Sequence, residues 1–164
     1  RAVGEVVEAA GGRLAISPVG HTRMKAVMAA ENAIFGGEHS AHYYFRDFWR
    51  ADTGMLAALH VLALLGRAES MSALVAGLPA YAASGELNTA VADPSAVMHE
   101  VGEALAGRGS ASWDDGLLVS GDDWWVSVRE SNTEPLLRLN VEARDEATMA
   151  ALRDQALAII RRDA

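Results

Sequence analysis

The stretch RESNTEPLLRLN (residues 129–140) separates two apolar segments and decides the architecture of the second half of the chain. The segment WWVSVR (residues 124–129), which runs into the start of this stretch, is rich in tryptophan and valine, which favour strands. At the far end of the stretch, Leu137 and Leu139, with Val141 just beyond it, alternate with polar residues, the period of a strand with one buried face. With a further apolar run at 117–120, the sequence predicts three strands, two of them joined by a polar loop.

The polar loop carries the groups that a phosphate needs. Arg129, Ser131, Asn132 and Thr133 supply a guanidinium, two hydroxyls and an amide, and Arg138 adds a second positive charge. A phosphate is held by convergent donors in a fixed turn together with one forked cation. An ordinary hairpin without a ligand is the alternative, because Ser, Asn, Thr and Pro favour turns for backbone reasons alone.

Elsewhere the spacing of apolar residues predicts alternating helices and short strands. Residues 77–94 contain two prolines and two glycines and no strong period, so a linker is expected near 80–88 and the two predicted domains are 1–80 and 88–164. The opening helix has no cap before it, which predicts that the chain starts inside a domain. The expected helices are the opening one up to Gly11-Gly12, then 22–30, 53–65, 95–105 and a last one capped by Asp145, and the additional expected strands are 13–17 and a buried one at 33–35.

Composition limits the partners of the protein. With 14 Lys plus Arg against 22 Asp plus Glu, the formal charge is −8, which argues against nucleic acid or an anionic membrane as a partner. Lys25 is the sole lysine, so most cations are guanidiniums suited to forked contacts. The absence of cysteine excludes disulfides and thiolate sites and fits a cytoplasmic protein. The first residues lack the hydrophobic centre of a signal peptide and no apolar run reaches the length of a membrane span, so a soluble, cytosolic protein is expected.

A second polar cluster lies in GGEHSAHYYF (residues 36–45). The carboxylate of Glu38 and the hydroxyl of Ser40 can accept from and donate to neighbouring sugar hydroxyls. His39 and His42 have zinc-ligand spacing only on a helix, which the flanking glycines oppose, and a third ligand is not evident. We therefore expect no metal ligand here. A polar turn whose histidines hydrogen-bond locally is the alternative.

Three motifs resemble those of the phosphohexomutases, the phosphomannomutase/phosphoglucomutase superfamily. The string R-x-S-N-T-E-P resembles the phosphate-binding loop of the last domain of that family. Residues 37–42 resemble its sugar loop G-E-x-S-G-H, although Ala41 stands where glycine is usual. Val19-Gly20-His21-x-x-x-Lys25 is similar to its V/T-G-H-x-x-x-K segment.

The resemblance implies a fold and a role for each loop. The fold would be a partial α/β third domain followed by an α+β C-terminal domain with an antiparallel sheet and flanking helices. His21 would transfer a proton to or from the reacting sugar, since imidazole exchanges protons near neutral pH. The implied substrate-binding residues are Lys25, Glu38, Ser40 and His42 for the sugar end, and Arg129, Ser131, Asn132, Thr133 and Arg138 for the phosphate that is not transferred.

The resemblance also implies an activity for the full-length protein. Family members interconvert hexose 1-phosphate and hexose 6-phosphate through a bisphosphate, using a phosphoserine loop (T-A-S-H-N-P) and a magnesium loop (D-G-D-x-D-R). Neither string occurs in this chain, so the phosphoserine and the Mg²⁺ ligands are expected on missing N-terminal domains, and this segment alone is expected to be inactive. A phosphoglucosamine mutase is one alternative, although Asn132 and His39 favour hexose phosphates. A phosphosugar-binding module without catalysis is another.

Overall fold

The structure is a computed structural model that describes residues 1–131 and 134–162. Asn132 and Thr133, which were predicted for the phosphate loop, lie outside the described residues. The chain divides into two compact units, Arg1–Pro79 and Ala80–Ala164, and each is described by itself. Within the described ranges, no helix combines the length and the apolar character that crossing a lipid bilayer requires.

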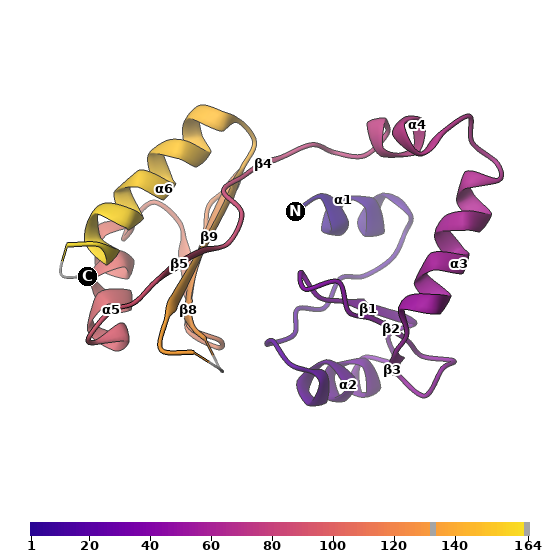
Figure 1. Cartoon of the computed structure of the whole chain (residues 1–164), viewed down its shortest axis with the longest axis horizontal. Helices are drawn as coiled ribbons and strands as arrows, with labels where there is room; N and C mark the ends of the chain where they lie inside the picture. Colours follow the sequence, from indigo (N-terminus) through magenta and orange to yellow (C-terminus); the bar gives the residue numbers. More distant parts are fainter. Residues whose placement is uncertain (132–133, 163–164) are drawn as a thin grey trace. The chain divides into compact units, whose positions relative to one another are not determined.

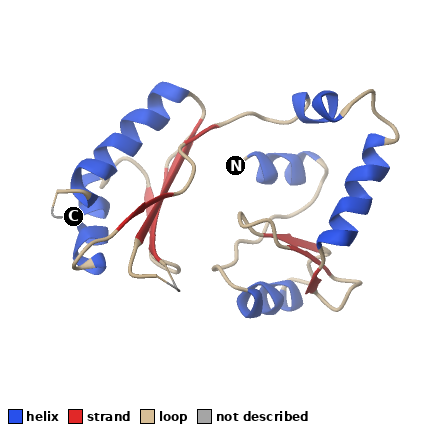
Figure 2. Cartoon of the chain, viewed as in Figure 1, coloured by secondary structure: helices blue, strands red, loops and turns tan. Residues whose placement is uncertain are grey.

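The first unit combines four helices with a small antiparallel sheet in the order β1-β2-β3 (Figure 1, Figure 2). The predicted helix over 53–65 is confirmed: Thr53 caps it by accepting a hydrogen bond from the backbone N–H of Leu56 at 3.4 Å. The elements are α1 (Ala2–Ala9), α2 (His21–Ala30), β1 (Phe35–Gly37), β2 (Tyr43–Phe45), β3 (Ala51–Asp52), α3 (Gly54–Leu65) and α4 (Met71–Ala76).

Two strand predictions in this unit are wrong. Residues 13–17 form no strand, because this extended segment pairs with no strand in the described part of the chain. The strand expected at 33–35 is displaced to Phe35–Gly37 and is not buried, since Ile34 is 69% exposed and Phe35 48%. β1 is an edge strand with a partner on one side only, and the Phe35 ring contacts Tyr43 and Phe45 of the neighbouring strand while remaining half exposed.

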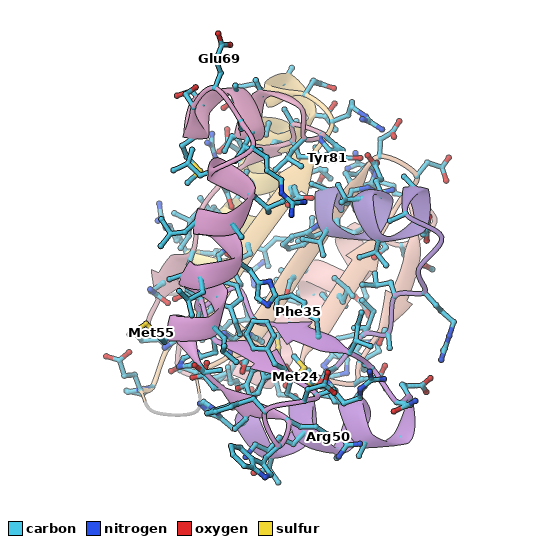
Figure 3. The ribbon with its side chains drawn as sticks, turned by 90° about the vertical axis from the view of Figure 1, so that its right-hand side faces the viewer. Met24, Phe35, Arg50, Met55, Glu69 and Tyr81 are labelled. Carbon is cyan, nitrogen blue, oxygen red and sulfur yellow. The ribbon has the colours of Figure 1, made fainter. Side chains whose placement is uncertain are left out.

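The first unit has a small core and a large exposed apolar surface. Met28 and Tyr44 are its buried hydrophobic residues among those described. An ideal Cβ on Gly36 would lie 2.9 Å from the Met24 sulfur, so a larger residue there would displace the methionine side chains of α2. In contrast, α3 is apolar apart from His60, and Met55, which projects away from the ribbon in Figure 3, is 72% exposed.

The second unit is an antiparallel sheet with both helices on one face (Figure 1). Its strand order is β4-β9-β8-β7-β6, and β5 also pairs with β9. The elements are β4 (Ala82–Ala83), β5 (Leu87–Thr89), α5 (Pro94–Ala104), β6 (Ser110–Ser112), β7 (Leu117–Ser120), β8 (Trp124–Glu130), β9 (Leu137–Ala143) and α6 (Glu146–Ile160).

The interval 80–88, predicted as a linker, contains strand residues of the second unit. β4 and the start of β5 lie there, and both pair with β9. Gly85, whose φ is 66°, turns the chain between two strands of one sheet. Composition did not distinguish this turn from a linker, because glycine, serine and short side chains serve both.

The core of the second unit follows the predicted alternation. Leu137, Leu139 and Val141 on β9 are each 1% exposed, and Val126 and Val128 on β8 are fully buried against them. The buried residues that α6 contributes are Met149, Leu152, Ala156 and Ile160. One face of the sheet therefore packs on the helices, and the opposite face carries the polar residues.

The cap of α6 is expected to make the stability of the fold depend on pH. Hydrogen bonds from the Thr148 backbone N–H (2.8 Å) and hydroxyl (2.9 Å) hold the pKa of the Asp145 carboxyl below its ordinary value. A lowered folded-state pKa means that this contribution to stability is complete above the unfolded-state value and is lost as the pH falls through the folded value. We expect Asp145→Ala to lower the free energy of unfolding at about pH 6.5 and to differ less from the parent at about pH 3.

Urea unfolding at both pH values measures the difference. Ser70→Ala is a suitable control, because Ser70 caps α4 by accepting from the Ala73 N–H at 3.1 Å and its hydroxyl does not titrate. If the difference in free energy of unfolding between the parent chain and Asp145→Ala is the same at both pH values, the Asp145 carboxylate does not contribute to stability as a charged cap.

Candidate functional site

Two arginines stand opposite each other where the polar loop leaves the second unit's sheet. Arg129 on β8 is the register partner of Arg138 on β9, and both lie on the face that α5 and α6 do not cover. Like charges directly opposite on a sheet destabilise it. The two guanidiniums therefore repel each other unless a negative charge lies beside them.

Glu86 lies beside both guanidiniums. Its carboxylate is 3.8 Å from Arg129 Nη2 and 3.5 Å from Arg138 Nη1. These distances exceed those of charge-assisted hydrogen bonds, so the two pairs are loose. The Arg138 Nε is buried without a hydrogen-bond partner among the described atoms. Sequence reasoning missed Glu86 because it fell in the presumed linker, and a lone carboxylate there gave no signal.

The described part of the loop holds Ser131 next to these arginines. The Ser131 N–H donates to the Leu136 carbonyl at 2.9 Å, which closes the base of the turn. The Ser131 hydroxyl oxygen accepts from Arg138 Nη2 at 2.9 Å and from the Glu134 N–H at 3.2 Å. Of the predicted phosphate-binding residues that the structure describes, it thus brings Arg129, Ser131 and Arg138 together.

Gly116 supports this end of the sheet. Its φ is 77°, and an ideal Cβ there would lie 2.6 Å from the Val128 carbonyl and 2.7 Å from the Arg129 Cβ. A larger residue would both strain the backbone and displace Arg129. Glycine at position 116 therefore allows Arg129 to keep its observed position on β8.

In the first unit, the loop between β1 and β2 carries the predicted sugar residues. The Glu38 N–H donates to the His42 carbonyl at 2.9 Å, and the Ala41 N–H donates to the Glu38 carbonyl at 3.0 Å. Ala41 has a φ of 63°, in the left-handed region where the family usually has glycine. Alanine there costs roughly 1–2 kcal/mol, yet the turn still closes. The substitution leaves Glu38, Ser40 and His42 on one loop.

Tyr44 joins this loop to helix α2. It is fully buried on β2, its hydroxyl donates to the Glu38 carboxylate, and the same oxygen lies 2.8 Å from Nδ1 of His21. Burial, followed by the Glu38 carboxylate, raises the pKa of Tyr44 above its ordinary value, so the phenol keeps its proton. Sequence reasoning missed Tyr44, although strand alternation puts it on the face opposite Tyr43 and Phe45.

The remaining predicted residues of this loop form a compact group. The Ser40 hydroxyl lies 2.8 Å from His42 Nδ1, and the His21 and His42 rings meet edge to face with centroids 4.8 Å apart. Asp52, another residue that sequence reasoning missed, places Oδ2 4.0 Å from His42 Nε2. Lys25 is exposed on α2, one helical turn after His21. His21, Glu38, Ser40 and His42 are thus neighbours in space.

Two surface hollows lie elsewhere. One is polar and lies in the second unit, lined by residues that include Asp122, Asp123 and Arg144. The other is apolar and lies in the first unit, between β1, β2 and α3, with Phe35 and Phe45 in its wall. Neither of these two hollows is lined by a predicted site residue.

The same two units match known domains. A sequence model of phosphoglucomutase/phosphomannomutase alpha/beta/alpha domain III matches residues 1–81, and a model of the phosphoglucomutase/phosphomannomutase C-terminal domain matches residues 86–159. These matches confirm the predicted order of an α/β domain and an α+β domain.

Individual proteins that resemble the chain have names from the same family. A phosphomannomutase of Salmonella typhimurium is 43% identical over 155 residues, which cover 93% of this chain and 34% of that protein. A protein of Xanthomonas campestris named "Phosphohexose mutases" is 41% identical over 157 residues, covering 92% and 34%. A crystal structure of a phosphoglucomutase/phosphomannomutase family protein from Burkholderia thailandensis is 29% identical with a TM-score of 0.82, covering 98% of this chain and 36% of that one.

The chain therefore spans about a third of the length of the relatives it matches. Both halves of it match consecutive domains of one family, and the motifs of both polar loops fall within the matched residues. The chain belongs to the phosphoglucomutase/phosphomannomutase family, of which it carries the third domain and the C-terminal domain.

Proposed function

We propose that the chain is the C-terminal part of a phosphomannomutase/phosphoglucomutase, an isomerase that interconverts hexose 1-phosphate and hexose 6-phosphate through a bisphosphate. The observation that carries the proposal is the Arg129–Arg138 pair beside Ser131 on the helix-free face of the sheet. The two facing guanidiniums repel each other and are only loosely paired with Glu86, and a phosphate has the charge and the oxygens to contact both at shorter distance.

In this proposal, the second unit binds the phosphate that is not being transferred. Arg129 and Arg138 form forked contacts with its oxygens, and Ser131 donates from the loop, with Asn132 and Thr133 as further donors. Glu86 keeps both guanidiniums on one side of the sheet while no substrate is bound, through ion pairs loose enough for a phosphate to replace.

The first unit binds the sugar. Glu38 accepts hydrogen bonds from ring hydroxyls, Ser40 and His42 contact neighbouring hydroxyls, and Lys25 reaches the substrate from α2. The Tyr44 hydroxyl orients the Glu38 carboxylate by donating to it. His21 exchanges a proton with the reacting hydroxyl as general acid and base, with its ring held through Nδ1 by Tyr44.

The rest of the reaction belongs to domains outside this chain. A phosphoserine there gives its phosphoryl group to the free hydroxyl of the sugar phosphate, the bisphosphate reorients, and its other phosphoryl group returns to the serine. Mg²⁺, which prefers oxygen ligands in an octahedron, is proposed for those domains, because the group of possible metal ligands among the described residues of this chain, His21, Glu38 and His42, contains two imidazoles. We place the reaction in the cytoplasm, consistent with a chain that lacks cysteine.

The test is the activity of the longer protein that contains this chain. We expect it to isomerise mannose 1-phosphate or glucose 1-phosphate, and we expect Glu38→Gln to lower kcat/KM by about 10- to 150-fold, the scale of 1.5–3 kcal/mol for losing a hydrogen bond to a charged group. Glu69→Gln is the matched control, since Glu69 projects from the same unit into the open (Figure 3).

Three other outcomes would change the proposed function. Equal activity of Glu38→Gln and Glu69→Gln would remove Glu38 from the sugar site. Binding of hexose phosphates without turnover would favour a non-catalytic phosphosugar-binding module. Turnover of glucosamine phosphate alone would assign the protein as a phosphoglucosamine mutase.

A further inference from the structure

Three side chains in the first unit have the identity and the spacing of metal ligands. His21 comes from the first position of α2, and Glu38 and His42 come from the two ends of the β1–β2 loop. Each offers one ligand atom, and these atoms all lie within 4.8 Å of one another. No metal was expected from the sequence because only the pair His39 and His42 was considered. His21, the third ligand, is far from this pair along the chain and was therefore overlooked.

Hydrogen bonds at the outer atoms of these side chains fit metal ligation. His42 Nδ1 lies 2.8 Å from the Ser40 hydroxyl, and His21 Nδ1 lies 2.8 Å from the Tyr44 hydroxyl. Tyr44 in turn donates to Oε1 of Glu38. Metal-ligating histidines are commonly fixed by a hydrogen bond from the other ring nitrogen, and ligating carboxylates are likewise hydrogen-bonded. With both Nδ1 atoms protonated, Nε2 of each ring and Oε2 of Glu38 keep lone pairs for a cation.

The local charge also favours a cation. With neutral imidazoles, Glu38 contributes one negative charge, and Asp52 places a second carboxylate 4.0 Å from His42 Nε2. Asp52 is itself held in place, because its Oδ1 accepts from the Tyr43 N–H at 3.0 Å. Two imidazoles and a carboxylate are a ligand set of Zn²⁺ and related transition metals, whereas Mg²⁺ and Ca²⁺ take oxygen ligands.

We propose that His21, Glu38 and His42 form a binding site for a divalent transition metal of the Zn²⁺ class, with water completing the coordination. Ligand atoms around Zn²⁺ lie about 3.3 Å apart for bonds of about 2.0–2.1 Å, so atoms that are up to 4.8 Å apart must approach one another on binding. His21 is the exposed member of the cluster, and its ring can approach the other two ligands while its Nδ1 keeps the hydrogen bond to Tyr44. The site itself does not depend on the proposed function.

One consequence does rest on the proposed function. The metal would occupy the side chains that the sugar needs, so metal and sugar phosphate would exclude each other and the metal site would be inhibitory. Glucose 6-phosphate is then expected to lower the apparent affinity of the chain for Zn²⁺. An unchanged affinity would overturn the inhibitory role and leave the metal site standing.

The experiment is a calorimetric titration of the 164-residue chain with Zn²⁺. We expect one saturable site per chain, at least about a tenfold loss of affinity in His21→Ala and in His42→Ala, and about a tenfold loss in Tyr44→Phe, the scale for removing an outer partner of a ligand. His39→Ala is the matched control, because His39 is an exposed histidine of the same loop outside the cluster. Its affinity should equal that of the parent.

Two further measurements guard against misfolded variants. Co²⁺ in place of Zn²⁺ should give visible absorption bands with the unaltered chain, which report nitrogen and oxygen ligation directly. Saturating Zn²⁺ should also raise the Tm of the parent and of His39→Ala, since a ligand of the folded state stabilises it. Absence of saturable binding to the parent would overturn the proposal, as would a loss of binding in His39→Ala that His21→Ala does not share.

Discussion

Arg129→Ala in the longer protein is expected to weaken binding of a hexose phosphate by roughly 2 to 4 kcal/mol, or about 30- to 1,000-fold in kcat/KM. The Arg129 side chain is 18% exposed, and its ionic partner Glu86 is 3.8 Å away. A phosphate would replace this loose pair by a forked, charge-assisted contact. Alanine removes that contact and leaves Arg138 alone to neutralise both Glu86 and the phosphate.

Two companion variants separate charge from geometry. Arg129→Lys keeps the charge and loses the planar fork, so its kcat/KM should fall between those of the parent and the alanine variant. Arg153→Ala removes an arginine from α6, where its partner is the neighbouring Asp154, and should leave kcat/KM unchanged. If Arg129→Ala retains parental kinetics, or if Arg153→Ala loses as much, Arg129 does not bind the phosphate.

Leu139→Ala is expected to lower the free energy of unfolding of the second unit by about 2 to 5 kcal/mol. Leu139 is 1% exposed at the centre of β9, where it is the register partner of both Val128 on β8 and Leu87 on β5. Truncation loses the burial of the side chain and leaves a cavity that neighbouring strands cannot close, because their own hydrogen bonds fix their spacing.

Urea unfolding of the chain, followed by tryptophan fluorescence, measures this loss. Leu62→Ala is the matched control: Leu62 is 59% exposed on α3, so the same truncation should change stability by no more than about 0.5 kcal/mol. Similar losses for the two variants would mean that β9 is not the centre of the core.

Local periodicity explains which elements were predictable. The alternation of Leu137, Leu139 and Val141 predicted the buried face of β9, and the capping residue Asp145 marked the start of α6. Both signals act within a few residues, since a strand repeats every two residues and a helix cap contacts the first turn.

Elements that depend on a distant partner were predicted poorly. Residues 13–17 have the composition of a strand but pair with no described strand, whereas Ala82 and Ala83 look like a linker and pair with β9. Strand formation requires a free neighbouring edge, and the position of that edge depends on segments far away in the sequence. Composition within a short window carries no information about it.

The same division holds for the two polar loops. The sequence by itself determined which chemical groups each loop carries. One loop has the guanidinium of Arg129 with neighbouring hydroxyls, and the other has the carboxylate of Glu38 with neighbouring imidazoles. These groups were predictable because the residue types that favour turns are recognised from short stretches of sequence. Only the tertiary structure decided which groups meet. It placed Glu86 between Arg129 and Arg138, and Tyr44 between Glu38 and His21, because these contacts arise from strand register and from helix packing across many residues.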